Sequence, residues 1–276
     1  MDTAISGMYC PVDDWLRARR HQERAQRRLV DAEIISIALT AARFFDGNFR
    51  DAQSLLLEQR YLTDGLSRSQ YDRRLHRIGS LLGALLDWLG RLHKTASCQN
   101  VFLIDSSPVP TCDNIRIRDC RIYPSAAKRG GVRGYHSSKR RGFYGLKVHL
   151  IVTAEGSPVE ASLTPGSVND TKHLRSLEID APEGSVLYGD KAYNEYFTED
   201  LLSAPASSSA HSERKNSTRA VSAPARYLQQ VYRKRVETTF SHIERMLPKS
   251  SHAVTARGFA LKMFLFVLAF SISGLV

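Results

Sequence analysis

Three acidic residues that lie far apart in the sequence stand where their carboxylates could bind a metal ion together. Asp105 ends the apolar run "VFLID" (101–105), and Asp190 follows the short run "SVLYG" (185–189). Glu237 in "RVETTF" comes one position beyond an apolar helical stripe, where its side chain can lean over a sheet edge. A short apolar run that ends at Gly or a charged residue indicates a buried strand. If the two strands lie side by side, both aspartates reach the same edge of one sheet.

Each of these residues also has a structural interpretation. Asp after Gly is commonly a solvated turn residue, because Asp tolerates turn geometry and hydrogen-bonds its own backbone. Glu237 follows Arg233 by four residues, so the two can form an ordinary ion pair on a helix surface. Lys191 either contacts a scissile phosphate or balances the charge of Asp190. Asp170 is an alternative ligand, although helix capping explains it better.

The charge of the whole chain favours the metal interpretation. Three carboxylates held close together repel one another unless a cation compensates them, and ligands that are all oxygen select Mg²⁺ or Mn²⁺. Two such ions about 4 Å apart can stabilise an in-line phosphoryl displacement. The chain carries a net charge of +11, which attracts polyanions, with nucleic acid first and an anionic membrane second. The sequence therefore predicts metal-dependent chemistry on nucleic acid.

Residues 1–97 are predicted to be helical. One helix is expected to begin at a capping box formed by Ser67 and Gln70, and to continue to residue 93 with an apolar stripe of leucines. Its first turns hold four arginines away from that stripe: Arg68, Arg73, Arg74 and Arg77. An apolar back with a cationic front suits insertion into a DNA groove. For any single arginine, an ordinary solvated face remains the alternative.

Residues 98–276 change to a pattern of strands and helices, so the fold class is α/β. Residues 144–166 are predicted to form two strands joined by a turn at 155–158, and 169–178 a short helix capped by Asn169 or Asp170. The Ser-, Ala- and Pro-rich segment 203–225 is predicted to be a loop. Helical periodicity returns over 226–247.

A second basic segment, "RGGVRGYHSSKRRGFYG" (129–145), combines glycines, cations and aromatic rings. This composition suits a connection that follows a DNA backbone and stacks on a base. The cations proposed for that contact are Arg133, Lys139, Arg140 and Arg141. A flexible exposed connection is the alternative.

Other features bear on the compartment. Cys10, Cys98, Cys112 and Cys120 have no zinc-site spacing, so we expect reduced thiols in a cytoplasmic, nucleoid-associated protein. The N-terminus has no apolar run of the kind found in signal peptides. The apolar stretch 263–276 is shorter than the roughly 20 residues that span a bilayer, so a buried closing helix is expected, and no membrane association.

Several segments, in this order, resemble the DDE transposases of bacterial insertion sequences, and the IS nine-eighty-two type most closely. They are "SRSQYDRRLH", "LIDSSPVPTCDNIRIRDCRIY", "GYHSSKRRGFYGLKVHLIVTAEGSPVE", "LYGDKAY", "RKNSTR" and "RKRVETTFSHIERMLPKSSHAVTARGF". The resemblance extends from about residue 30 to the end. It implies a mixed, RNase H-like sheet flanked by helices (98–276), preceded by an all-α DNA-binding region (1–97). It also implies a catalytic, metal-binding triad of Asp105, Asp190 and Glu237, with Mg²⁺ as cofactor and Mn²⁺ as a substitute.

The resemblance further implies that the protein binds the terminal inverted repeats of an insertion sequence and catalyses DNA cleavage and strand transfer. The implied partners are double-stranded DNA, both element ends and target, and further copies of the chain in a homo-oligomer. Arg233, one turn before the glutamate, occupies a position that contacts DNA in related groups. This chain has "ASSSAHSE" where the family pattern has an apolar strand before "RKNS". Two alternatives therefore stay open: a catalytically decayed transposase that only binds DNA, and an RNase H-fold nuclease without strand transfer.

Overall fold

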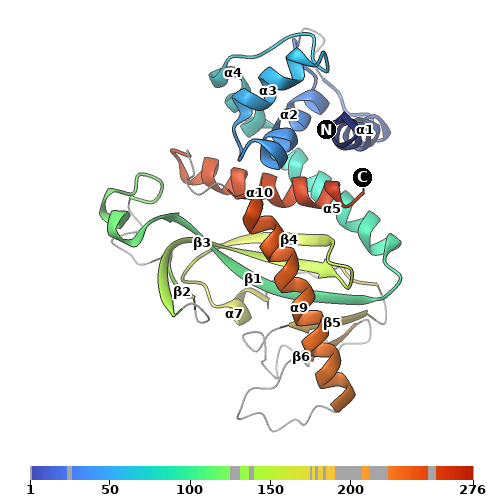
Figure 1. Cartoon of the computed structure of the whole chain (residues 1–276), viewed down its shortest axis with the longest axis vertical. Helices are drawn as coiled ribbons and strands as arrows, with labels where there is room; N and C mark the ends of the chain where they lie inside the picture. Colours follow the sequence, from blue (N-terminus) through green and yellow to red (C-terminus); the bar gives the residue numbers. More distant parts are fainter. Residues whose placement is uncertain are drawn as a thin grey trace. The chain divides into compact units, whose positions relative to one another are not determined.

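The computed structural model describes residues 2–23, 27–124, 131–136, 140–174, 176–177, 180–182, 185–189, 207–211, 223–247 and 253–275 (Figure 1). By its internal contacts the chain divides into two compact units. The helical unit comprises Met1–Gly90 together with Ile243–Val276, and the sheet unit comprises Arg91–His242. These units differ from the two predicted regions in two respects: the first boundary follows Gly90 and not residue 97, and the C-terminal residues from Ile243 group with the N-terminal helices. The functional assignment of 1–97 and 98–276 stays a prediction.

The helical unit is built around one almost completely buried helix, α2 (Asp31–Phe44). It packs against α1 (Asp2–Ala18), α3 (Phe49–Glu58) and α10 (Ala256–Ser273). The helix α4 (Arg68–Arg77) adds Tyr71, whose hydroxyl donates to the carbonyl of Ile34 at 3.0 Å. Helix α5 (Gly79–Ala96) begins in this unit. The prediction that the N-terminal region is helical is confirmed.

The single helix predicted over 67–93 is wrong, because the structure forms two helices there. The predicted capping box is present: Gln70 N–H donates to Ser67 Oγ at 3.4 Å, and Ser67 N–H donates to Gln70 Oε1 at 3.0 Å. Helix α4 then ends with Ile78 as its C-cap, and α5 starts at Gly79. Gly79 is thus the first residue of α5, and a helix end tolerates Gly better than a helix interior does.

The sheet unit contains a mixed sheet, as predicted. Its strand order is β2 (Arg133–His136), β3 (Arg141–Thr153), β1 (Val101–Cys112), β5 (Ser185–Gly189) and β6 (Ser207–His211), and β4 (Pro158–Pro165) also pairs with β3. Strand β1 is antiparallel to β3 and parallel to β5. Two helices, α7 (Asp170–Leu174) and α9 (Ala223–Met246), accompany the sheet (Figure 1).

The two faces of the sheet are covered differently. On one face, Phe102, Ile104 and Leu187 pack with Leu174 of α7 in an apolar cluster. On the other, the ring of Tyr188 lies 5.0 Å from the ring of Tyr232 of α9. The predicted turn between β3 and β4 is confirmed, and its Gly156 has a positive φ of 97°. The carbonyl of Gly156 accepts a hydrogen bond from the Thr239 hydroxyl of α9 at 3.1 Å.

Two strand predictions are corrected. Strand β1 does not end at Asp105 but continues to Cys112, through Pro108 and Pro110. Within the described residues β5 pairs with β1 only as far as Ile104, so the prolines lie on an edge, where a missing N–H is tolerated. The predicted loop 203–225 contains the strand β6, which pairs in parallel with β5. Strand pairing uses backbone groups, so a serine-rich segment can supply it.

The predicted closing helix is α10, and it starts earlier than the apolar stretch suggested. Residues Ala256–Ser273 form one helix that is long and apolar enough to cross a membrane, and half of it is buried inside the protein. Such a helix is weak evidence for a membrane protein, because core helices of soluble proteins have the same composition. Its buried side chains include Phe259, Met263 and Phe266, as expected for a core helix.

Candidate active site and nucleic-acid interface

Asp105 lies in the middle of the sheet, on β1. Its register partner on β3 is the buried Leu150. The carboxylate is partly exposed, and its Oδ1 accepts a hydrogen bond from the backbone N–H of Ser106 at 2.7 Å. A hydrogen bond from a neighbouring N–H restricts the orientation of a carboxylate.

The strands that carry the two predicted aspartates are parallel neighbours. Gly189, the last residue of β5, lies opposite Ile104, which immediately precedes Asp105. Asp190 follows Gly189 in the sequence, but Asp190 and Lys191 lie outside the described residues. The two strands are thus paired side by side, which is the condition that the prediction of a shared edge required.

Asp105 lies on the face of the sheet that α9 covers. Side chains two positions apart in a strand point to the same face, so Asp105 shares a face with Leu103. Leu103 is the register partner of Tyr188, and the ring of Tyr188 packs on Tyr232 of α9. The helix that carries Glu237 is therefore on the same side of the sheet as the Asp105 carboxylate.

Glu237 lies on the exposed side of α9. The preceding residue Val236 is buried, as are Thr239 and Phe240, which confirms the predicted position of Glu237 beside the apolar stripe. Its Oε1 accepts from Arg233 Nε at 2.9 Å, and both side chains are about half exposed. The ion pair expected from the spacing of four residues is thus formed.

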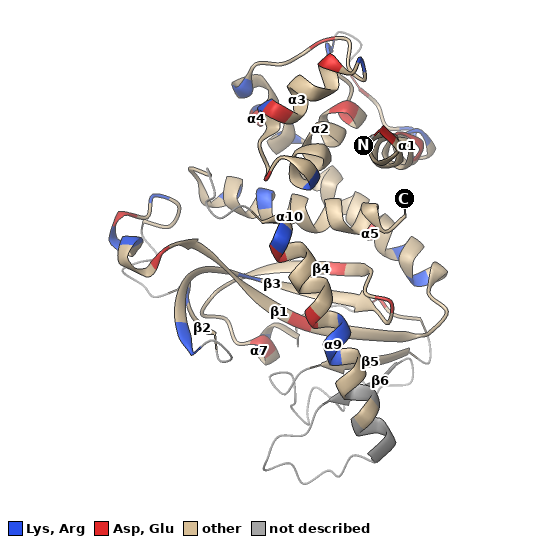
Figure 2. Ribbon diagram, viewed as in Figure 1, with Lys and Arg blue, Asp and Glu red and all other residues tan. Residues whose placement is uncertain are grey.

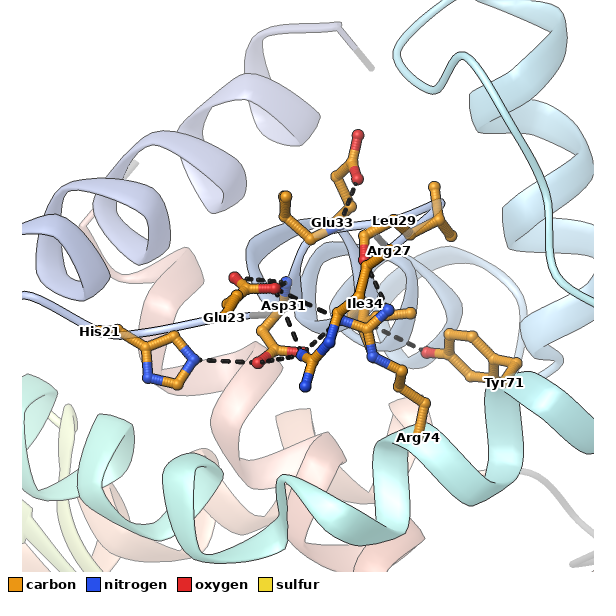
Figure 3. Close-up of polar contacts among 10 residues, drawn as sticks. His21, Glu23, Arg27, Leu29, Asp31, Glu33, Ile34, Tyr71 and Arg74 are labelled. Atoms are coloured by element: carbon orange, nitrogen blue, oxygen red, sulfur yellow. Dashed lines mark hydrogen bonds and ion pairs between the residues drawn. The ribbon is translucent and has the colours of Figure 1, made fainter. Parts of the chain in front are cut away.

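Of the four arginines predicted on α4, three are exposed and one is internal. Arg68, Arg73 and Arg77 are exposed. The guanidinium of Arg74 contacts Asp31 Oδ1 at 2.6 Å and Glu23 Oε2 at 3.4 Å, and it also donates to the carbonyl of Leu29 (Figure 3). The charge of Arg74 is therefore compensated by carboxylates within the protein.

The ion-pair network around Arg74 also contains three residues with metal-ligand chemistry: His21, Glu23 and Asp31, whose ligand atoms lie within 4.8 Å of one another. Arg27 contacts Asp31 Oδ1 at 3.1 Å from another side (Figure 3). Two guanidinium groups already compensate the two carboxylates and would repel a metal cation. Burial alone would raise the pKa of Asp31, but hydrogen bonds from His21 and Arg74 and the charges of Arg74 and Arg27 outweigh it and lower the pKa. This network is structural.

The second predicted basic segment belongs to a structured extension of the sheet. We call it the arm: residues 109–124, 131–136 and 140–146, which include the end of β1, the 3₁₀ helix η1 (Asn114–Asp119), β2 and the start of β3. Arg133, Arg140 and Arg141 are exposed there, whereas Lys139 lies outside the described residues. Figure 2 shows cations along the arm. The interpretation as a wholly flexible connection is wrong for these residues, because β2 and β3 pair in register.

The arm carries further exposed arginines that the sequence analysis missed: Arg116, Arg118 and Arg121. Nine of the residues 113–144 are Lys or Arg and two are Asp. Helical periodicity could not reveal these arginines, because they lie in irregular sequence. The high density of cations in 113–144 was the sequence signal that could have indicated them. In the helical unit, Lys262 of α10 was also missed. Burial lowers its pKa, and the charge of Arg68 lowers it further.

Three other polar groups are placed by the structure. Asp170 pairs with Lys147 at 2.9 Å, and the cap of α7 is Asn169, whose Oδ1 accepts from Thr171 N–H at 2.9 Å. The prediction that Asn169 or Asp170 caps this helix is thus confirmed for Asn169, whereas Asp170 pairs with Lys147 instead of capping. His149 is buried and contacts Thr164 Oγ1 at 2.8 Å. Burial and the charges of His173 and Lys147 lower the pKa of His149 to about 3, so it is neutral at physiological pH.

Comparison with known proteins identifies the family. Residues 95–252 match the family model described as transposase DDE domain. The match covers more than half of the chain. The chain belongs to the transposase DDE domain family. The matched range contains both described acids of the predicted triad, Asp105 and Glu237.

Two further comparisons add little. No curated protein matches the chain. Among solved structures, it is similar to a piggyBac transposase in a synaptic complex with hairpin DNA, with 10% identity and a TM-score of 0.45 over 99% of this chain and 73% of that one. A similarity of this strength carries no structural or functional argument. Membership in the transposase DDE domain family therefore depends on the sequence match.

Proposed function

We propose that this protein is a transposase of a bacterial insertion sequence, of the IS nine-eighty-two type, that binds the terminal inverted repeats of its element and joins them to target DNA. The observation that carries the proposal is the transposase DDE domain match over 95–252. The parallel pairing of β1 with β5 supports it. We propose an RNase H-like sheet as the catalytic core and the cytoplasm, at the nucleoid, as its place of action.

The proposed catalytic residues are Asp105, Asp190 and Glu237. Their carboxylates are hard oxygen ligands, which fits Mg²⁺, with Mn²⁺ as a substitute. When bound, the metal ions would lower the pKa of the attacking water or 3′-OH and neutralise charge on the phosphate. Asp105 is held by the Ser106 N–H on a rigid strand, which fixes its position. Arg233 compensates the charge of Glu237, and because its side chain is about half exposed we propose that it also contacts a phosphate of the bound DNA.

DNA contact is proposed for two basic surfaces. In the helical unit, Arg68, Arg73 and Arg77 of α4 would lie along a groove, and Lys262 joins Arg68. In the sheet unit, the arginines of the arm would follow the phosphate backbone: Arg116, Arg118, Arg121, Arg133, Arg140 and Arg141, with Lys139 and Lys191 retained as sequence-based proposals. Arg74, which has an internal role in the structure, is no longer proposed. Assembly into a homo-oligomer that bridges two DNA ends completes the proposal.

A strand-transfer assay tests this function. The full chain would meet a labelled DNA end from the flank of its own gene and a plasmid target, with Mg²⁺ or with EDTA. Joined product is expected only with Mg²⁺, and it should fall to background in Asp105→Asn and in Glu237→Gln. Asp87→Asn, an exposed acid of α5, is the matched control and should keep wild-type activity.

The same assay separates the alternatives. Joining at the wild-type rate by Asp105→Asn and Glu237→Gln would overturn the assignment of the triad. Cleavage without joining would indicate a nuclease with the same fold. Metal-independent binding without any product, in Mg²⁺ or Mn²⁺, would indicate a decayed transposase. The presence of β6, where the family pattern expects a strand, favours an intact sheet over a decayed one.

A further inference from the structure

Two cysteines stand at the two ends of η1 in the arm. Cys112 is the last residue of β1, and Cys120 directly follows η1, with its N–H donating to the carbonyl of Ile117 at 3.3 Å. Cys120 is buried, and Cys112 is partly buried beside it in the apolar cluster that forms the interior of the arm. Both are free thiols. Their placement is unlike that of Cys10 and Cys98, which are exposed.

The surroundings of Cys120 favour its thiolate. The Thr111 hydroxyl lies 3.8 Å from its sulfur. Burial alone would raise the pKa of Cys120, but hydrogen bonding to the backbone of Tyr123 and Ile122 and to the Cys112 thiol outweighs it and lowers the pKa. Burial and the adjacent Cys120 raise the pKa of Cys112 to about 11. Cys120 is therefore the more readily deprotonated of the two, and Cys112 packs against the same apolar cluster.

The arm holds the two sulfurs in place. Tyr144 is fully buried, and its hydroxyl donates to the carbonyl of Tyr123 at 2.7 Å. The Thr111 hydroxyl donates to the carbonyl of Tyr144 at 2.9 Å. These bonds tie Thr111, which precedes Cys112, and Tyr123, three residues after Cys120, to Tyr144 of β3. Two thiols alone are not a zinc site, whereas two adjacent thiols, one of them activated, are the arrangement that forms a disulfide.

We propose that Cys112 and Cys120 are a redox-active dithiol, which hydrogen peroxide oxidises to a disulfide that closes the segment containing η1. The Cys120 thiolate attacks one oxygen of the peroxide and breaks the O–O bond, which gives a sulfenic acid and hydroxide. The sulfur of Cys112 then attacks the sulfur of Cys120, loses its proton and expels hydroxide. In total the two sulfurs lose two electrons. The proton from Cys112 converts one hydroxide to water, and the second hydroxide takes up the proton that Cys120 lost when its thiolate formed, so one peroxide gives two molecules of water.

The disulfide would restrain a segment with a proposed role in binding DNA. It bridges nine residues, Cys112 to Cys120, that include Arg116 and Arg118 of η1. A closed loop has fewer open conformations, so oxidation should make η1 more rigid. The redox chemistry itself does not depend on the proposed transposase function.

Peptide mapping tests the proposal. The full chain with Cys10→Ser and Cys98→Ser is treated with one equivalent of hydrogen peroxide, alkylated and digested with trypsin. Cleavage after Lys94, Arg116, Arg118 and Arg121 places Cys112 in the peptide 95–116 and Cys120 in 119–121. We expect these two peptides to be joined, and to separate on reduction with dithiothreitol. The matched variant that also carries Cys112→Ser should give no joined peptide.

The contrary result is also defined. If both cysteines remain fully open to alkylation after a peroxide treatment that oxidises Cys10 and Cys98 in the wild-type chain, the proposal fails.

Trypsin digestion of the folded protein provides a second readout. The oxidised chain should be cut after Arg116 and Arg118 about tenfold more slowly than the reduced one. An equal rate would show that the disulfide does not restrain η1. Unchanged tryptophan fluorescence and circular dichroism of the Cys112→Ser chain would show that it is folded.

Discussion

At the scale of single residues, Arg74 and Arg73 show that neighbours in one basic helix can have opposite roles. Arg74 points inward to a carboxylate, Asp31, whose side chain is only 3% exposed. Arg73 is exposed, and its Nε donates to the carbonyl of Ser69 at 3.1 Å. The sequence placed both on the polar face of α4, because helical periodicity separates faces but does not say which segments fold back onto them.

Removal of these two side chains should therefore have opposite effects. Arg74→Ala leaves a buried carboxylate undercompensated, so we expect it to lower the free energy of unfolding by about 3 kcal/mol. Arg73→Ala should change it by less than about 0.5 kcal/mol and weaken DNA binding instead. Urea unfolding followed by tryptophan fluorescence measures the first effect, since both tryptophans, Trp15 and Trp88, are in the helical unit. Equal stabilities of the two variants would contradict the internal role of Arg74.

The same network predicts a dependence of stability on pH. The pKa of Asp31 in the folded state lies below its ordinary value of 3.8, so the folded state binds this proton less readily than the unfolded state. The stabilisation is therefore complete above about pH 4. It is lost as the pH falls through the folded pKa. Urea midpoints of the helical unit should fall on acidification from pH 7 to pH 3, and the fall should be smaller in Asp31→Asn. A variant with the full acid sensitivity of the wild type would exclude Asp31 as its source.

At the scale of elements, the sequence predicted the strands and turns whose formation depends on the residues within them. Apolar runs predicted β1, β3, β4 and β5, and the turn residues near Gly156 predicted the β3–β4 hairpin. The features that the sequence did not predict depend on pairing with neighbouring strands. The continuation of β1 past Asp105 depends on β3, and β6 depends on the open edge of β5. The parallel placement of β1 and β5 was a condition of the predicted site, and only the fold could supply it.

The arm is the element with the clearest functional prediction. If Arg116 and Arg118 each neutralise a DNA phosphate, Arg116→Ala with Arg118→Ala should weaken binding and reduce the slope of log affinity against log salt by about 2. A double variant with the same change in charge, Arg91→Ala with Lys172→Ala, is the control, because both residues are exposed and lie outside the proposed surfaces. Fluorescence anisotropy on a labelled duplex at several salt concentrations gives both slopes. Equal slopes for the two double variants would mean that only net charge matters.

At the scale of the whole molecule, the helical unit is assembled from both ends of the chain. Helix α10 contributes Phe259 and Phe266 to its core. The guanidinium of Arg257 donates to the carbonyl of His76 at 2.9 Å, near the end of α4. The charge of Arg68 of α4 lowers the pKa of Lys262 of α10. The sequence could not predict that α10 packs with the N-terminal helices. The apolar composition of the C-terminal segment indicates that the segment is buried, but it does not indicate which residues cover it.

This assembly predicts that residues 1–97 do not fold alone. Without α10 the buried helix α2 loses one of its main neighbours, and apolar surface equivalent to several core side chains is exposed, each worth about 3–5 kcal/mol for an aromatic residue. A fragment 1–97 should show weak helical circular dichroism and solvent-exposed tryptophans, and addition of a peptide 253–276 should restore both signals. In the full chain, Phe266→Ala should destabilise the helical unit strongly, whereas Val254→Ala, at an exposed position, should not. A fragment 1–97 that is natively helical and binds DNA with full affinity would instead support an independent N-terminal domain.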